Sequence, residues 1–147
     1  MIMDTQNQDF SRIATRKIIK NAKFERDSIS IDLDYVANHS DFTFGLCEFL
    51  DEFKRSDNKG GMIENSPQPG IASRESLCIL AAVAHKLAND YSLDIPKWVF
   101  HPMYKMPHPI FAHNTTNEEY QRFLIGDSPR EFADKNVFYG SRAIERV

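Results

Sequence analysis

The strongest hydrophobic pattern in the chain lies between residues 73 and 91. At its centre, residues 77–84 form an unbroken run of eight apolar side chains, Leu-Cys-Ile-Leu-Ala-Ala-Val-Ala. Successive residues of a helix are about 100° apart, so this run covers every direction and most of the helix must be buried. The alanines keep the helix narrow, and Ser73 is a suitable N-cap. The pattern predicts a buried central helix.

A second helix is predicted over residues 40–55, with Ser40 or Asp41 as its N-cap. Its apolar side chains recur at helical spacing and share one face: Phe42, Leu46, Phe49, Leu50 and Phe53. A stripe of bulky phenylalanines suits the narrow surface of the 73–91 helix. We expect the two helices to pack against each other in antiparallel orientation.

The connection between these helices, residues 56–72, is predicted to be a surface loop. Residues 56–70 contain three glycines and two prolines, which interrupt regular structure. A connection of this length inside a compact domain is either mobile or functional. Residues 28–38 are ambiguous: their alternating pattern is typical of a strand, yet it also permits a short helix from Ser30. Because no partner strand is predicted, we favour helix or irregular structure there.

Residues 93–113 are predicted to be irregular because four prolines exclude long helices. Their aromatic side chains should lie over the helical core, with Trp98 as the largest anchor. A short helix fits at 97–100, since Pro96 suits a first-turn position. Three further short helices are predicted towards the C-terminus. The first runs from Thr115 or Thr116 to Ile125 and is ended by Gly126, and its inward-facing residues are Tyr120, Phe123 and Leu124. The second is capped by Ser128 with Pro129 in its first position, and the third, which follows extended residues 137–139, is capped by Ser141 and carries Ile144 and Val147.

The chain is therefore expected to form one all-α domain over residues 1–147, a helical bundle with a proline- and aromatic-rich C-terminal layer. Residues 1–8 read as a tail. A helix over residues 9–23 would carry the only concentrated basic surface on one half of its wheel: Arg12, Arg16, Lys17, Lys20 and Lys23. Such a surface is either a solvated helix face or a contact for an anionic partner, nucleic acid or an acidic protein.

Composition adds few constraints on function. The net charge of the 147-residue chain is −3, too small to indicate nucleic-acid or membrane binding by the whole molecule. No apolar run approaches the roughly 18 residues of a membrane span, and the polar N-terminus lacks a signal-peptide core. Cys47 and Cys78 lie among apolar neighbours and are expected to be reduced core thiols, with a disulfide as the alternative. We expect a cytoplasmic protein without membrane contact.

The case for an enzyme is weak. His101, His108 and His113 share the proline-rich segment, but no cysteine lies near them and no HExxH pattern is present. There is no phosphate-binding loop and no GxSxG elbow. His85, on the central helix, is expected to be a structural residue. We expect no catalytic residue, no metal site and no cofactor.

Two motifs in the C-terminal half resemble a family. An alanine-rich helix is followed by P-x-W-V at residues 96–99, and SP-x-x-F-x-x-x-N-V-F follows at residues 128–138. This combination resembles small uncharacterised bacterial proteins from toxin–antitoxin-like gene neighbourhoods. The likeness covers about residues 75–147 and implies an accessory or antitoxin-like role without an activity. Residues 133–135 are less basic here than in many members, which weakens a role for this turn in nucleic-acid contact.

The leading hypothesis is a non-catalytic binding or regulatory protein that engages a partner protein. Its contact surfaces would be the basic residues of the 9–23 helix and the proline-rich segment, represented by Trp98 and Tyr104. The alternatives are a nucleic-acid-binding protein that uses the basic helix, and a small metal-dependent hydrolase that uses the three loop histidines. The sequence leaves open whether the chain forms a homo-oligomer.

Overall fold

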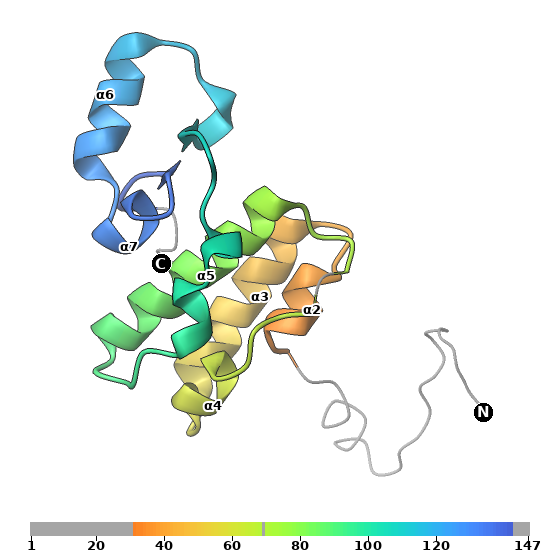
Figure 1. Cartoon of the computed structure of the whole chain (residues 1–147). Coiled ribbons are helices and arrows are strands. Elements are labelled where there is room, and N and C mark those ends of the chain that lie inside the picture. The colour runs from red at the N-terminus through yellow and green to blue at the C-terminus, as the bar shows by residue number, and fades with distance from the viewer. Residues whose placement is uncertain (1–30, 69, 143–147) are drawn as a thin grey trace. The chain divides into compact units, whose positions relative to one another are not determined.

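The computed structural model describes residues 31–68 and 70–142, and Figure 1 shows their arrangement. The predicted tail at 1–8, the basic helix at 9–23 and the last helix with Ile144 and Val147 lie outside these residues. The described elements, in chain order, are α2 (Leu33–Ala37), α3 (Phe42–Arg55), α4 (Lys59–Ile63), α5 (Arg74–Asp90), the 3-10 helices η1 (Lys97–Phe100) and η2 (Pro102–Tyr104), β2 (Ile110–Phe111), the 3-10 helix η3 (Ala112–Asn114), α6 (Glu118–Asp127), α7 (Arg130–Ala133) and β3 (Val137–Phe138). The predicted all-α class is confirmed, with the addition of one small strand pair.

The predicted central helix is confirmed as α5. Ser73 caps it, and its hydroxyl accepts a hydrogen bond from the Ser76 backbone N–H at 3.1 Å. Every residue from 77 to 84 is buried. Burial of this many apolar side chains supplies most of the stability of a helix in a folded protein. Within the described part of the chain, no helix is both long and apolar enough to cross a membrane.

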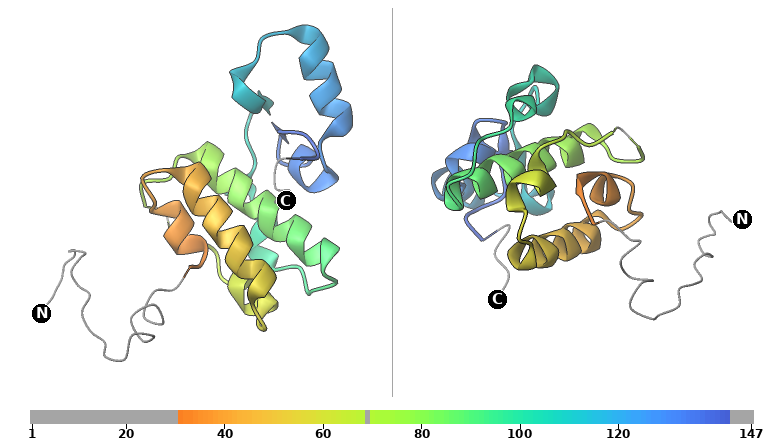
Figure 2. Two further views of the ribbon diagram at one scale, coloured as in Figure 1. Left: turned by 180° about the vertical axis from the view of Figure 1, so that it is seen from behind. Right: turned by 90° about the horizontal axis from the view of Figure 1, so that it is seen from below.

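The predicted phenylalanine stripe is confirmed in α3, whose N-cap Asp41 accepts a hydrogen bond from the Phe44 N–H at 3.0 Å. Phe49 and Phe53 are fully buried, and Phe42 is half-buried. In both Figure 1 and Figure 2, α3 lies beside α5. The buried side chains of both helices belong to one hydrophobic cluster.

The expected antiparallel orientation of these helices is wrong. Both run in the same direction (Figures 1 and 2), and the rings of Phe53 and Tyr91, at their C-terminal ends, meet edge to face at 5.2 Å. The connecting segment returns along the helices before α5 begins. Its residues 64–73 can extend over roughly 33 Å, whereas the 14 residues of α3 span only roughly 21 Å. The Gln68 N–H fastens this segment to α2 by donating to the Asp34 carboxylate at 2.6 Å.

The prediction of a loop without helix over residues 56–72 is also wrong, because α4 lies within it. Asn58 caps α4 by accepting a hydrogen bond from the Gly61 N–H at 3.2 Å. The Lys59 ammonium donates to the Ser56 carbonyl at 2.9 Å, and Ile63 is fully buried. The cap and the buried isoleucine outweigh the low helix propensity of two glycines.

In residues 31–38 the favoured helix is present as α2, and the strand alternative is wrong. The Asp32 side chain caps α2 by accepting a hydrogen bond from the Tyr35 N–H at 2.9 Å. Leu33, Val36 and Ala37 are buried, at spacings of three and four residues. That spacing places them on one helix face against the core.

In the C-terminal layer, β2 and β3 form a parallel pair with Ile110 opposite Val137 and Phe111 opposite Phe138. This pair confirms the extended prediction for residues 137–139 over Val137–Phe138. The predicted short helix at 97–100 is present as η1, in 3-10 form.

Three details of α6 differ from prediction. Asn117, rather than a threonine, caps it by accepting a hydrogen bond from the Tyr120 N–H at 2.8 Å, and the helix continues past Gly126 to Asp127. Leu124 is buried, but Tyr120 is 38% and Phe123 58% exposed. The reason is that, among the described elements, α6 packs mainly on β3, which leaves these rings partly exposed. Ser128 does not cap α7, since its hydroxyl donates back to the Leu124 carbonyl at 2.6 Å.

Candidate functional site

The proline-rich segment 96–109, which we call the strap, is anchored through its inward-facing side chains. The Trp98 indole N–H donates to the Ile63 carbonyl at 3.0 Å. The rings of Trp98 and Tyr104 meet edge to face at 5.2 Å, and Tyr104 is only 4% exposed. Val99, between them, is fully buried. These contacts fix one side of the strap on the helical core.

The turn after α7 holds the strap from the other side. The Lys135 ammonium, which is buried, donates to the Val99 carbonyl, and the Lys135 carbonyl accepts from the Met106 N–H at 3.0 Å. The Asn136 side-chain amide donates to the Met106 carbonyl at 2.8 Å, and the Asn136 carbonyl accepts from the Ile110 N–H at 2.9 Å. Asn136 has a φ of +63°, a conformation that asparagine tolerates better than most residues.

The burial of Lys135 carries an electrostatic cost. Burial lowers the pKa of Lys135, and the nearby Cys78 and Asp134 oppose that shift. A buried ammonium is tolerated only when hydrogen bonds replace its lost water. The carbonyl of Val99 supplies such a bond, so the strap and the lysine depend on each other.

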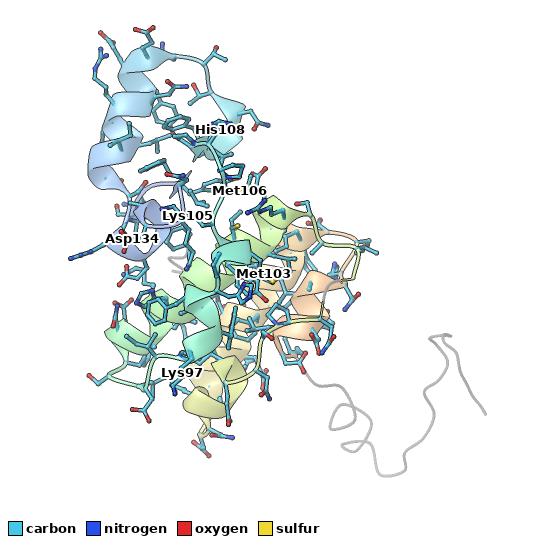
Figure 3. The ribbon with its side chains drawn as sticks, in the orientation of Figure 1. Lys97, Met103, Lys105, Met106, His108 and Asp134 are labelled. Atoms are coloured by element: carbon cyan, nitrogen blue, oxygen red, sulfur yellow. The ribbon has the colours of Figure 1, made fainter. Side chains whose placement is uncertain are left out.

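The outward side of the strap is apolar at its centre and basic at its edges. Phe100 is 61% and Met103 39% exposed, while Lys97 and Lys105 are exposed on either side of them. In Figure 3 the labelled side chains of the strap follow one another along one side of the described residues. The prolines fix the backbone that carries them. The result is a preformed surface with an exposed phenylalanine.

The chargeable side chains along the strap itself are all basic. Residues 95–117 contain two lysines and three histidines but no aspartate or glutamate. Beside the strap, Trp98 and Lys97 border an open hollow of about 790 Å³, which Glu64 and Asp94 also line. The hollow is therefore of mixed charge, and carboxylates also lie near Phe100, since Glu131 and Asp134 act on His85, whose ring contacts it.

The structure places the predicted site residues in different situations. Trp98 is half-buried and Tyr104 buried, so both shape the strap from beneath. The basic residues of the 9–23 helix lie outside the described residues. Sequence reasoning missed Phe100 and Met103 because it treated all strap aromatics as inward anchors. The sequence feature that could have identified them is their position between prolines, in a stretch that Lys97 and Lys105 flank.

The histidines do not assemble a site in the described residues. There, no three His, Cys, Asp or Glu side chains form a group that could hold a metal ion. His85 is half-buried, and its ring meets Phe100 edge to face at 5.1 Å. Burial lowers the pKa of His85, and Glu131 opposes the shift. The neutral imidazole thus supports the exposed phenylalanine.

The cysteines are both free thiols. Cys78 is buried as expected, and burial raises its pKa, which makes the thiolate less available. The expectation that Cys47 is also buried is wrong, because it is partly exposed on α3.

Aromatic and methionine side chains, such as the exposed Phe100 and Met103, are enriched in protein contact surfaces. The geometry of the strap offers shape, apolar area and positive charge. Comparisons of the chain with protein-family models, with curated proteins and with solved structures found no match.

Proposed function

We propose that this chain is a non-catalytic binding protein of the cytoplasm that engages a partner protein through its strap. The observation that carries the proposal is the exposure of Phe100 on a backbone that is anchored on both flanks. Aromatic side chains contribute much of the binding energy of protein interfaces. The partner would offer an apolar pocket flanked by carboxylates.

The energetics favour such an interface. Burial of one phenylalanine contributes about 1.5–3 kcal/mol, and Met103 next to it adapts to irregular partner surfaces. The strap is already ordered by its anchors, so binding costs little conformational entropy. Lys97 and Lys105 would accelerate association with an acidic surface and contribute to selectivity.

The regulatory, antitoxin-like part of the proposal rests on the family resemblance. Its two motifs meet in space, since P-x-W-V contains Val99 and the SP-x-x-F-x-x-x-N-V-F motif contains Lys135, which binds the Val99 carbonyl. Both motifs therefore support the strap. If the neighbouring gene encodes a toxin, co-expression with this chain should relieve growth arrest, and replacing Phe100 should remove that relief.

The binding proposal is tested by co-purification from the native host with a matched pair of variants. Phe100→Ala with Met103→Ala removes the exposed centre of the strap. Phe44→Ala is the control, because Phe44 is 54% exposed and its ring also lies near a histidine, His39, at 5.5 Å. We expect one partner at near-stoichiometric amounts with the parent chain and with Phe44→Ala, and its loss with the double variant. Retention by the double variant, or no partner at all, contradicts the proposal.

A second candidate function is nucleic-acid binding through the 9–23 helix, favoured by the five basic residues on one half of its wheel. Phosphate contacts make such binding strongly salt-dependent. Charge reversal at Arg16, Lys17 and Lys20 should then abolish it, whereas the strap variants should leave it unchanged. No binding of duplex or single-stranded DNA or RNA at low salt would eliminate this candidate.

A further inference from the structure

Two exposed aromatic rings on α6 form a second surface, which we call the α6 patch. The rings of Tyr120 and Phe123 stack at 6.2 Å with an interplanar angle of 9°. Both side chains are exposed, whereas Leu124 of the same helix is buried. Aromatic residues are enriched in the contact surfaces of proteins. The pair is therefore a candidate contact, separate in sequence from the strap.

Two charged side chains of opposite sign lie on one flank of the α6 patch. At 3.6 residues per turn, Glu119 lies about 40° and Arg122 about 100° from Phe123 around the helix axis. The buried Leu124 lies on the other side of Phe123. Glu119 and Arg122 are both exposed, and within the described part of the chain neither takes part in an ion pair. The flank thus offers one acid and one base, three positions apart.

This arrangement of charges is complementary to itself under two-fold symmetry. When two copies of a helix pack in antiparallel orientation about a two-fold axis, the same flank of each copy faces the other, and the order of residues is reversed. Glu119 of one copy then lies beside Arg122 of the other, and this pairing occurs twice. Tyr120 of one copy likewise meets Phe123 of the other. Antiparallel packing also brings the positive end of one helix dipole beside the negative end of its partner.

We propose that the α6 patch binds a second copy of this chain through an antiparallel pair of α6 helices. A wholly acidic partner would oppose Glu119 and a wholly basic one would oppose Arg122, so a surface that carries both signs fits best. Because α6 has only 10 residues, the contact is small. We expect a reversible dimer with a dissociation constant between about 10 μM and 1 mM. The strap takes no part in this contact, so the proposal does not depend on partner binding there.

Sedimentation equilibrium of the full chain over a range of concentrations tests the proposal. The parent chain should pass reversibly from monomer to dimer, and added salt should weaken the dimer because its two ion pairs are near the surface. A chain that remains monomeric up to about 1 mM, or one that forms larger closed assemblies in place of a dimer, overturns the proposal.

Charge reversal then tests the antiparallel pairing itself. Glu119→Arg alone and Arg122→Glu alone should each weaken the dimer at least tenfold, because each places like charges opposite each other twice. An equimolar mixture of these two variants should form a heterodimer of nearly parental affinity, and so should the chain that carries both substitutions. Glu64→Arg, an exposed position on the segment after α4, makes the same change in net charge and should dimerise like the parent. Unweakened single variants, or a mixture without rescue, overturn the proposal.

Removal of the rings tests the aromatic contact. Tyr120→Ala with Phe123→Ala should weaken the dimer at least tenfold while urea unfolding stays close to that of the parent, because both side chains are exposed. Phe44→Ala removes another exposed phenylalanine and should dimerise like the parent, as should the strap variant with Phe100→Ala and Met103→Ala. Equal weakening by Phe44→Ala or by the strap variant overturns the assignment of the dimer to the α6 patch.

Discussion

The Lys135 ammonium donates a hydrogen bond to the Val99 carbonyl, and this bond joins the two sequence motifs through residues that are 36 positions apart. Lys135 is only 6% exposed, so the bond replaces water that the ammonium has lost. Val99 directly precedes the exposed Phe100 in the chain. The bond that holds the strap therefore also holds the backbone that carries Phe100.

Replacing Lys135 by glutamate should destabilise the fold by about 3–5 kcal/mol, because it buries an unpaired negative charge and leaves the Val99 carbonyl without its donor. Lys135→Met should cost much less, since it keeps the apolar stem and removes the buried charge. Urea unfolding measures both. Lys105→Glu, at an exposed position, is the control and should stay within about 0.5 kcal/mol of the parent. Equal effects of the two glutamate variants would contradict the role of Lys135.

The stripe of α3 gives a paired test in one helix. Phe53 is fully buried and its ring contacts Tyr91, whereas Phe44 is exposed. Phe53→Ala should cost about 3–5 kcal/mol through lost burial and a cavity, and Phe44→Ala should cost less than about 0.5 kcal/mol. The free energy of unfolding in urea measures the difference. Similar losses of unfolding free energy at the two positions would show that Phe53 does not lie on the buried face of α3.

Alkaline pH should weaken the contact between α2 and α3. The Tyr35 hydroxyl donates to the Glu48 carboxylate, and burial, followed by the bond and charge of Glu48, raises the pKa of Tyr35 to about 12. Because the folded pKa exceeds the ordinary value of 10.0, this contribution is complete below pH 10 and is lost as the pH rises towards 12.

The measurement is the free energy of unfolding at steps between pH 8 and pH 12. Tyr35→Phe should lower it by about 1 kcal/mol at pH 8 and make the alkaline decline shallower. Tyr139→Phe is run alongside, because the raised pKa of Tyr139 acts in the same direction. A decline that is unchanged in Tyr35→Phe would contradict this account.

Mild acid should destabilise the fold through His85. Burial lowers the pKa of His85 from 6.5, so the native state favours the neutral imidazole. The associated stability is present above pH 6.5 and is lost as the pH falls through the lower, folded pKa. His85→Leu should show a smaller fall in melting temperature between pH 7 and pH 5 than the parent. His108→Gln, at an exposed strap position, should fall like the parent, and an equal fall in His85→Leu would contradict the prediction.

The sequence predicts those elements whose burial follows a helical period. The apolar patterns of α3 and α5 are long and capped, so the type and the position of both helices can be predicted from the sequence. Their relative direction is not, because the length and path of the intervening chain decide it. Tyr120 and Phe123 show a second limit: periodicity indicates which residues share a face, but not whether another element covers that face.

The candidate site was predictable only in its location. The proline-rich segment stands out by composition, and Trp98 by size, so the strap and one anchor were identified. The bonds from Lys135 and Asn136 to strap backbone atoms join residues some 30 positions apart, and such contacts leave no local pattern in the sequence. Phe100 differs from the buried aromatic residues of the strap only in that its side chain is directed outward, and the bonds from Lys135 and Asn136 hold the strap in that orientation.

Site-specific photo-crosslinking in the native host tests the central claim most directly. A benzoyl-phenylalanine placed at residue 100 probes the strap, and the same group at residue 44 probes an exposed phenylalanine on α3. We predict one discrete crosslinked protein from residue 100, reduced by excess unlabelled parent chain but not by excess chain carrying Phe100→Ala and Met103→Ala, and none from residue 44. No crosslink from residue 100, or the same crosslinked protein from both positions, would contradict the proposal that the strap binds a partner.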